Sequence, residues 1–584
     1  MKSSTYLFVC ACAVLTLASH AASPERTASV TRFQNSCREM GLPTSNMLVG
    51  FATSMEKILP REVPFDVKPA RTIEVTLARN EKESLQVAVM PVADALRNVS
   101  IGVSDLTSAN GGVLARTNIN CDVVGYLETK KRPPYKVSHV GWWPDPILDF
   151  LGPVNIAAGD LQTFWVRIRA PKEQHPGVYH GTLTVRAEGI EPLIFRLSVR
   201  VFSFALPDHS PLPLAITFFE QIEQMGGQAN WSKRKFNYAD FLADYYINYD
   251  SLYRAEPPDF EIVKRLHDRG RLVAFNLGNV FNDGAPTNSF DQALSNTVAR
   301  LQVAYDKAKE LGVLDHAYIY GFDERGQEQF SSLEKCAQGL RKAFPEVLLM
   351  TTSYDQSYGL ESVVKTIDAW CPLTPVFKPE QAVKAREAGR RVWWYICCGP
   401  QNPPANMFVE YAAIEGRLLM GAMTAKQRPD GFLYYSLTIW NQNKPIETGP
   451  FTDWNPVSWT TFHGDGSWFC SGPGGKPVPT IRLENFRDGL EDFAYACILE
   501  ESIRRQEAKG NSLSTQETQW LAEAKSALAV PEVLVKTMSE YSRDSAALYS
   551  WRNRIGDLID RSGMTEVNPW GSNFGVRGFS GSGK

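Results

Sequence analysis

The chain has 584 residues, more than one domain usually contains and enough for two large cores. Its 61 basic and 64 acidic residues give a net charge of −3. No basic stripe or acidic tail stands out, which argues against nucleic acid and against a charged disordered arm as partners.

The first residues have the pattern of a secretory signal. Lys2 is the single charged residue among the first 23, and residues 6–18 form an apolar run. Small residues for cleavage follow at 19–22. We predict a signal peptide over residues 1–22 and an exported protein, extracellular, periplasmic or in an endomembrane lumen. No later stretch of about 18 apolar residues occurs, so no membrane span is expected.

Residues 23–206 read as an all-β domain. Short alternating strands separated by turns fit the segments 72–78, 83–90, 163–170, 177–187 and 193–202. Few helical periods interrupt them, which is the pattern of a β-sandwich. The proline-rich stretch 206–213 then reads as a linker to the next domain.

After the linker, strands and helices alternate. Eight candidate strands cover residues 213–219, 247–253, 271–278, 316–322, 347–354, 367–373, 391–398 and 431–440. Eight strand–helix units predict a (β/α)8 TIM barrel, whose active site lies at the C-terminal ends of the strands. Helices are expected at 483–509, 515–527 and 531–560. The predicted fold class is therefore multidomain, all-β followed by α/β, with the barrel and its C-terminal helices in residues 207–567 and a flexible Gly/Ser-rich tail in residues 568–584.

Cysteine usage gives no support for a metal, a cofactor or a disulfide scaffold. Eight cysteines lie outside the signal, no CxxC occurs, and no pair of histidines has zinc-ligand spacing. Cys397 and Cys398 end an apolar strand and are expected to be buried thiols. The charge-dense run at 482–492 is expected to form a structural network of ion pairs.

Two adjacent carboxylates, Asp323 and Glu324, are the most informative feature of the chain. They end the apolar and aromatic segment 316–322 and precede a helical stretch at 327–344. Two acids this close cannot ionise independently, so one can donate a proton while the other stays charged. Glycosidic bond cleavage needs this division of labour. The alternative is a helix-capping acid beside a solvated glutamate.

Polar and aromatic residues at other strand ends are candidates for binding a substrate. They are Asn276, Tyr354, Trp394, Tyr395, Tyr434 and Trp440. Because successive strand residues face opposite sides, only one of Trp393 and Trp394 can face the cavity. Each aromatic taken alone is more often a core residue than a ligand contact. Several strand ends converging on one face are the stronger signal.

Three motifs resemble glycoside hydrolase family 123. The segment LARNEKESLQ at residues 77–86 is similar to that family's N-terminal sandwich. WWYICCGP at 393–400 with GFLYY at 431–435, and VPTIRLENFRDGLED at 478–492, are similar to its barrel. Together with the carboxylate pair, the resemblance covers most of the mature chain. It implies an exo-acting, retaining β-N-acetylgalactosaminidase that uses substrate-assisted chemistry.

The resemblance also implies roles for the two acids. Glu324 would protonate the leaving oxygen and then activate water. Asp323 would hold the N–H of the substrate's 2-acetamido group and stabilise an oxazolinium-like intermediate. The substrate's own carbonyl oxygen would be the nucleophile, and a tyrosine hydroxyl would orient it, Tyr395 first and Tyr354 second.

The expected partner is a carbohydrate, the terminal β-linked amino sugar of a glycan or glycolipid. Two other functions stay open at this point. One is a glycosidase of other specificity on the same scaffold. The other is a catalytically silent carbohydrate-binding protein, against which the intact pair Asp323 and Glu324 argues.

Overall fold

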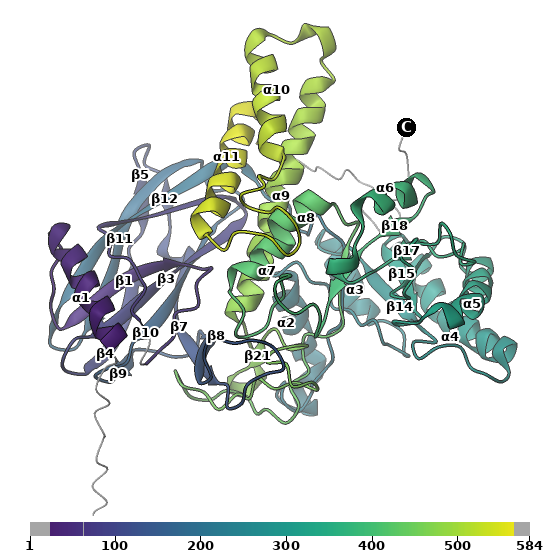
Figure 1. The fold of residues 1–584 in the computed structure, drawn as a ribbon, viewed down its shortest axis with the longest axis horizontal. Helices are drawn as coiled ribbons and strands as arrows, with labels where there is room; N and C mark the ends of the chain where they lie inside the picture. Colours follow the sequence, from purple (N-terminus) through teal and green to yellow (C-terminus); the bar gives the residue numbers. More distant parts are fainter. Residues whose placement is uncertain (1–23, 62–63, 566–584) are drawn as a thin grey trace, which may run out of the picture.

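The computed structural model describes residues 24–61 and 64–565. The predicted signal peptide, 1–22, and the predicted tail, 568–584, lie outside the described residues. An N-terminal β-rich part and a parallel α/β part lie side by side, and three C-terminal helices project between them (Figure 1).

The N-terminal part contains two sheets that share one hydrophobic core. The five-stranded sheet has the order β1 (Met47–Thr53), β3 (Glu81–Pro91), β10 (Gln162–Ala170), β7 (Ile119–Glu128) and β8 (Trp142–Leu148). The seven-stranded sheet has the order β2 (Thr72–Arg79), β12 (Ile190–Ala205), β11 (Gly177–Ala187), β4 (Leu96–Val103) and β9 (Val154–Ile156). Strand β5 (Leu106–Ser108) also pairs with β11, and β6 (Val113–Leu114) pairs with β5. Helix α1 (Pro24–Glu39) precedes the first strand.

Strand β12 shows why this sequence forms a layered structure. Phe195, Leu197, Val199 and Val201 are buried, while the residues between them are more exposed. This period of two places one face of the strand on the core. Neighbouring strands pair antiparallel except for β2 and β12, which are parallel. The expectation of an antiparallel β domain is confirmed.

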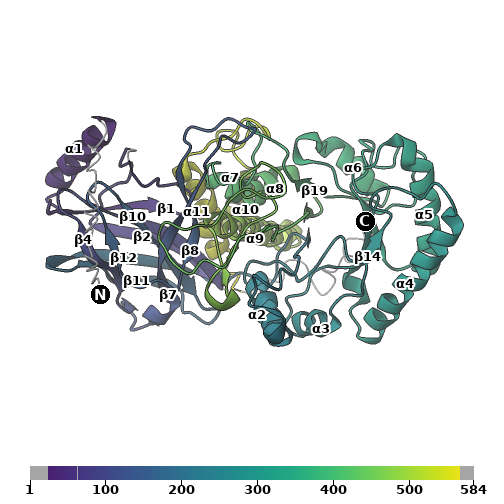
Figure 2. The same ribbon diagram turned by 90° about the horizontal axis from the view of Figure 1, so that it is seen from below.

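The second part is built from parallel strands. One sheet has the order β13 (Leu214–Ile216), β20 (Phe432–Tyr434) and β19 (Trp394–Ile396). The other has the order β14 (Phe275–Val280), β15 (Ala317–Gly321), β16 (Leu348–Thr351), β17 (Ala369–Trp370) and β18 (Arg391–Val392). Figure 2 shows the helices around these strands: α2 (Trp231–Ala243), α3 (Phe260–Asp268), α4 (Phe290–Glu310), α5 (Phe330–Ala343) and α6 (Pro379–Glu387).

In the described residues, backbone pairing does not by itself close the eight-stranded ring predicted from the sequence. The predicted strand at 247–253 contains only an isolated bridge between Asp250 and Thr217, and a second bridge joins Leu373 to Tyr395. All eight predicted strands nevertheless contribute to one buried cluster, which contains Ala215, Leu252, Ala274, Tyr318, Tyr320, Met350, Ala369, Cys371, Trp393, Tyr395 and Leu433. What is confirmed is a parallel α/β region with helices around it.

The predicted linker is part of the core. The sandwich ends at Ala205 and the first parallel strand begins at Leu214. Between them, Leu206 and Leu212 are buried, and the side chain of Ser210 bonds the backbone of Leu212. The proline-rich stretch is therefore a packed connection rather than a free tether.

The C-terminal helices are α9 (Ile481–Glu507), α10 (Thr515–Leu528) and α11 (Ser545–Ser562). The predicted helix at 531–560 begins 14 residues late, because residues 531–544 form turns after Pro531. Short helices α7 (Ile414–Leu418) and α8 (Thr424–Gln427) pack against α9. No helix within residues 24–61 and 64–565 is long and apolar enough to span a membrane.

The predicted ion-pair network on α9 is confirmed, and it ties the two parts together. Arg482 pairs with Asp145 of β8 at 2.8 Å, and Glu484 with Arg167 of β10 at 2.6 Å. Arg482, Asp145 and Glu484 are buried and Arg167 is partly exposed, so removing one partner would leave a buried charge uncompensated. The network holds the parallel region in a fixed position against the β domain.

Candidate active site

The carboxylate pair lies on a tight turn that the sequence builds with a glycine. A Cβ at Gly321 would lie 2.1 Å from the carbonyl oxygen of Val280, so only glycine fits there. Phe322 and Glu324 have φ values of 54° and 51°, in the left-handed region that non-glycine residues rarely adopt. Such conformations cost about 1–3 kcal/mol each and cluster at functional sites.

Neighbouring strand ends hold this turn in place. The N–H of Asp323 donates to the carbonyl of Asn282 at 3.0 Å, beyond the end of β14. On the other side, the hydroxyls of Thr351 and Ser353 donate to the carbonyl of Phe322 at 3.1 and 2.9 Å. Hydrogen bonds to the backbone of the turn from both sides therefore compensate for the strain.

Hydroxyl groups surround the Asp323 carboxylate. Oδ1 accepts hydrogen bonds from Tyr320 at 2.5 Å and Thr352 at 2.8 Å, and Oδ2 accepts a longer one from Tyr253 at 3.3 Å. A carboxylate has about four acceptor positions, so Oδ2 keeps room for a further donor. In the described part of the chain, neither Asp323 nor Glu324 forms an ion pair with a basic side chain.

Two tyrosines flank Glu324 at different depths. The hydroxyl of the buried Tyr395 donates a hydrogen bond to Oε1 of Glu324. Tyr354, at the rim, is 57% exposed. Burial is the main cause that raises the pKa of Tyr354 to about 12, and the nearby Glu324 carboxylate adds to it. Burial and Glu324 also raise the pKa of Tyr395 far above 10, so both hydroxyls remain protonated donors at neutral pH.

The loop after β20 adds side chains that the sequence reading did not select. Asp465 is fully buried and accepts a hydrogen bond from Tyr434 at 3.1 Å. Burial raises the pKa of Asp465 from 3.8 to about 6. Trp459 is 64% exposed, and its Nε1 donates to the Tyr435 hydroxyl at 2.7 Å. No periodicity marks these residues in the sequence, because they lie on a long irregular loop.

Four predicted substrate contacts serve the fold instead. Trp394 is fully buried and packs edge-on against Phe377. Side chains alternate along the strand, and its neighbours Trp393 and Tyr395 belong to the buried cluster shared by the eight predicted strands. The prediction that Trp394 faces the cavity is therefore wrong. Trp440 is also fully buried, and its Nε1 donates to the carbonyl of Phe469 at 2.8 Å.

Asn276 and Tyr434 have their polar atoms occupied within the protein. The Asn276 amide donates to the carbonyls of Ser251 and Leu252, both at 3.0 Å. The Tyr434 hydroxyl lies between Asp465 and the N–H of Gly466. Tyr354 and Tyr395 are thus the two predicted contacts that the structure brings beside the carboxylate pair.

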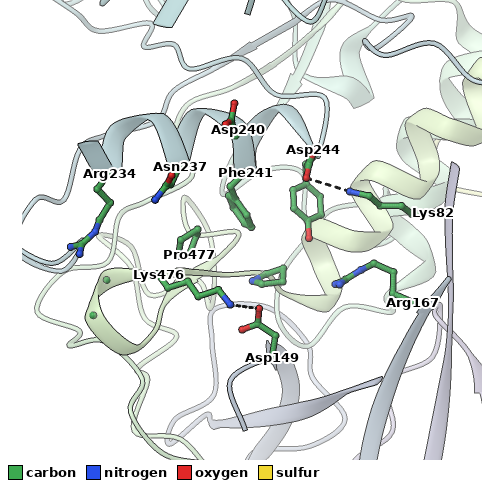
Figure 3. A pocket seen from close by; sticks show the side chains of 14 residues that line it. Lys82, Asp149, Arg167, Arg234, Asn237, Asp240, Phe241, Asp244, Lys476 and Pro477 are labelled. Carbon is green, nitrogen blue, oxygen red and sulfur yellow. Dashed lines mark hydrogen bonds and ion pairs between the residues drawn. The ribbon is translucent and has the colours of Figure 1, made fainter. Parts of the chain in front are cut away.

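A cavity of about 670 Å³ lies away from this site, between α2 and the β domain (Figure 3). Two ion pairs lie within its lining, Lys82 with Asp244 at 3.6 Å and Lys476 with Asp149. Phe241 and the two prolines Pro477 and Pro479 supply its apolar surface. It does not contain Asp323 or Glu324, and we place the chemistry at the carboxylate pair.

Metal-ligating clusters are not part of the site. The described residues contain no group of three or more His, Cys, Asp or Glu side chains that could hold a metal ion. Cys397 and Cys398, expected to be buried, are partly exposed free thiols. What the site presents is two carboxylates, several hydroxyl donors and exposed aromatic rings, a set suited to proton transfer on a polar, uncharged substrate.

Comparison with known proteins agrees with this chemistry. Residues 284–499 match the model of the glycoside hydrolase 123 catalytic domain, and residues 54–187 match that of the glycoside hydrolase 123 N-terminal domain. Together the two matches span more than half of the chain. A search of curated proteins found no match.

Among solved structures, a family 123 glycoside hydrolase from Clostridium perfringens, described in work on glycolipid glycan hydrolysis, is similar over 88% of this chain and 98% of its own, with a TM-score of 0.66 and 14% identity. An FMN-binding β-glucuronidase from Facaelibacterium prausnitzii has a TM-score of 0.30 at 8% identity over 76% of this chain and 61% of its own. That second likeness is too low to carry an argument. The catalytic-domain match covers both carboxylates and both flanking tyrosines, and this chain belongs to glycoside hydrolase family 123 and is a glycoside hydrolase.

Proposed function

We propose that this protein is an exported, exo-acting, retaining β-N-acetylgalactosaminidase that uses the substrate's own acetamide as the nucleophile. The observation that carries the proposal is the pair Asp323 and Glu324, held on a strained turn and free of basic partners in the described residues. The proposal includes a (β/α)8 barrel as the catalytic domain, because all eight predicted strands share one buried cluster.

Asp323 is suited to hold the acetamide N–H. Tyr320 and Thr352 occupy Oδ1, while Oδ2 has only the long contact with Tyr253. An N–H placed at Oδ2 would turn the acetamide oxygen toward the anomeric carbon. As positive charge develops on the cyclising group, a nearby carboxylate without a basic partner stabilises it.

Glu324 is suited to act first as acid and then as base. When Glu324 is ionised, its Oε1 accepts the hydrogen bond that the Tyr395 hydroxyl donates. When it is protonated, its own O–H can point at the glycosidic oxygen. The Tyr395 hydroxyl is then released to donate to the acetamide oxygen. Tyr395 would therefore donate to Glu324 in one protonation state and to the nucleophilic acetamide oxygen in the other.

An enzyme nucleophile is less well supported. Asp465 is the carboxylate on the β20 side of the site, and its pKa is raised to about 6 by burial. The Tyr434 hydroxyl bonds Oδ1, and the Thr460 hydroxyl lies 3.5 Å from Oδ2. A buried carboxylate already engaged by hydroxyl donors is a poor nucleophile, which favours attack by the substrate's acetamide.

The proposed substrate is the terminal β-linked amino sugar of a glycan or glycolipid. Support for a glycolipid comes from the Clostridium perfringens relative, whose description names glycolipid glycan hydrolysis. Export through the predicted signal peptide is likewise part of the proposal.

A panel of chromogenic β-glycosides tests the function directly. We expect turnover of the N-acetylgalactosaminide, weaker turnover of the N-acetylglucosaminide, and none of the galactoside, which lacks the acetamide. Preferred cleavage of the galactoside would instead indicate a glycosidase of other specificity. Sugar binding without any turnover would indicate a silent carbohydrate-binding protein.

A further inference from the structure

Tyr354 is an exposed aromatic residue fixed beside the proposed acid. Its side chain is 57% exposed, although most large apolar and aromatic residues of this region are buried. Its backbone N–H donates to the carbonyl of Arg325 at 2.8 Å. The strand end that carries Tyr354 is therefore bonded to the same turn that carries Glu324.

The two tyrosines beside Glu324 lie at different depths, and this difference separates the two sides of the scissile bond. Tyr395 is 4% exposed and belongs to the inner cluster. An exo-acting enzyme buries the terminal sugar, so this deep side belongs to the sugar that is cleaved off. The general acid must reach the oxygen that joins this sugar to the leaving group. The leaving group therefore extends from Glu324 toward the exposed side, where Tyr354 lies.

The other exposed aromatic of this face is placed differently. Trp459 is 64% exposed, but it is hydrogen-bonded to Tyr435 at the end of β20. Glu324 follows β15, which belongs to the other parallel sheet. No contact links Trp459 to Glu324 in the described chain. Of the two exposed aromatic residues, Tyr354 is therefore the one that lies beside the proposed acid.

We infer that Tyr354 is the stacking platform for the leaving-group sugar, so that the enzyme acts on glycosides whose second unit is a pyranose. The inference rests on the proposed function and specifies the second half of its substrate. The apolar C–H face of a pyranose can pack on the phenol ring. A leaving group without a ring gains nothing from this contact. This position also makes Tyr354 a weaker candidate than Tyr395 for orienting the acetamide.

The test compares two substrates that carry the same terminal sugar. One is a disaccharide in which this sugar is β-linked to galactose, and the other is the corresponding glycosyl fluoride, whose leaving group has no ring. For Tyr354→Ala we expect kcat/KM on the disaccharide to fall about tenfold, mainly through KM, as expected for the loss of one aromatic contact. On the fluoride, whose leaving group makes no contact with the ring, kcat/KM should fall no further than it does for Tyr354→Phe, which also lacks the hydroxyl.

Tyr354→Phe is the matched variant. It keeps the ring and removes the hydroxyl beside Glu324, so the ratio of the two kcat/KM values should stay at the wild-type value even if both values fall. Equal losses on both substrates for Tyr354→Ala, or no loss on the disaccharide, would overturn the inference. If the wild type does not cleave N-acetylgalactosaminides, the proposed identity of the terminal sugar is wrong. The ratio of kcat/KM on the disaccharide to that on the fluoride is then measured with the sugar that the glycoside panel identifies. Absence of turnover on every sugar would overturn both.

Discussion

The Tyr320 hydroxyl donates a 2.5 Å hydrogen bond to Oδ1 of Asp323, three residues further along the chain. Tyr320 is fully buried in β15, and the Thr352 hydroxyl after β16 donates to the same oxygen at 2.8 Å, so two strands fix one carboxylate oxygen. The other oxygen, Oδ2, has a single long contact, from the Tyr253 hydroxyl at 3.3 Å. A carboxylate with one oxygen fixed by the protein and the other nearly unoccupied is positioned to accept one further hydrogen bond from a substrate.

The first prediction concerns the charge of Asp323. Asp323→Asn keeps the shape of the side chain and removes the charge that would face the oxazolinium-like intermediate. We expect kcat to fall by roughly 10²–10³, as for the loss of one electrostatic stabiliser. Circular dichroism should be unchanged. A loss of less than a few-fold in steady-state kinetics would mean that Asp323 is only a structural acid of the turn.

Tyr320 should act through Asp323. In Tyr320→Phe the carboxylate loses its shortest hydrogen bond, and we expect kcat to fall by about tenfold or more because the reacting groups are misplaced. A double-mutant cycle provides the control. If Tyr320 only positions Asp323, the same substitution should cost little in the Asp323→Asn background. Additive losses would mean that Tyr320 acts independently.

Glu324→Gln removes the proton donor and preserves the fold. Natural glycosides, whose leaving groups need protonation, should no longer be cleaved at a measurable rate. Activated aryl glycosides should lose much less, since their leaving groups depart with little help from an acid. Near-normal hydrolysis of a natural glycoside by this variant would exclude Glu324 as the general acid.

Asp465 makes the stability of the protein depend on pH. Its pKa is 3.8 in the unfolded chain and about 6 in the folded protein, because burial disfavours its charge. Between these two values the folded state binds more protons, so its stability falls as pH rises. The penalty is absent below pH 3.8 and complete above pH 6, where it amounts to about 3 kcal/mol.

Asp465→Asn should remove this dependence, because an amide does not ionise. Relative to this variant, the wild type should lose up to about 3 kcal/mol of unfolding free energy between pH 4 and pH 7. Denaturant unfolding of both proteins at several pH values measures the difference. A constant difference across this range would mean that Asp465 titrates normally in the folded protein.

The sequence predicted the strand, the turn and the two acids, because an apolar segment that stops at paired carboxylates is a local pattern. It could not predict Tyr253 and Thr352 as partners of Asp323, since these come from other strands. It also chose Trp394 over Trp393. Every residue of WWYI is apolar or aromatic, so the segment lacks the alternation that would reveal which side faces inward. Tyr395, on the same strand, donates a hydrogen bond to Glu324.

The central claim is that the substrate's acetamide, and not an enzyme carboxylate, attacks the anomeric carbon. The most direct measurement is kcat/KM for aryl β-glycosides whose N-acetyl group carries no, one, two or three fluorines. Fluorine withdraws electrons from the carbonyl oxygen, while the rest of the sugar and the leaving group stay the same. We therefore predict that kcat/KM falls steeply along the series, by about 100-fold or more overall. Values that stay within a few-fold across all four substrates would show that the acetamide oxygen is not the nucleophile, and would contradict the mechanism.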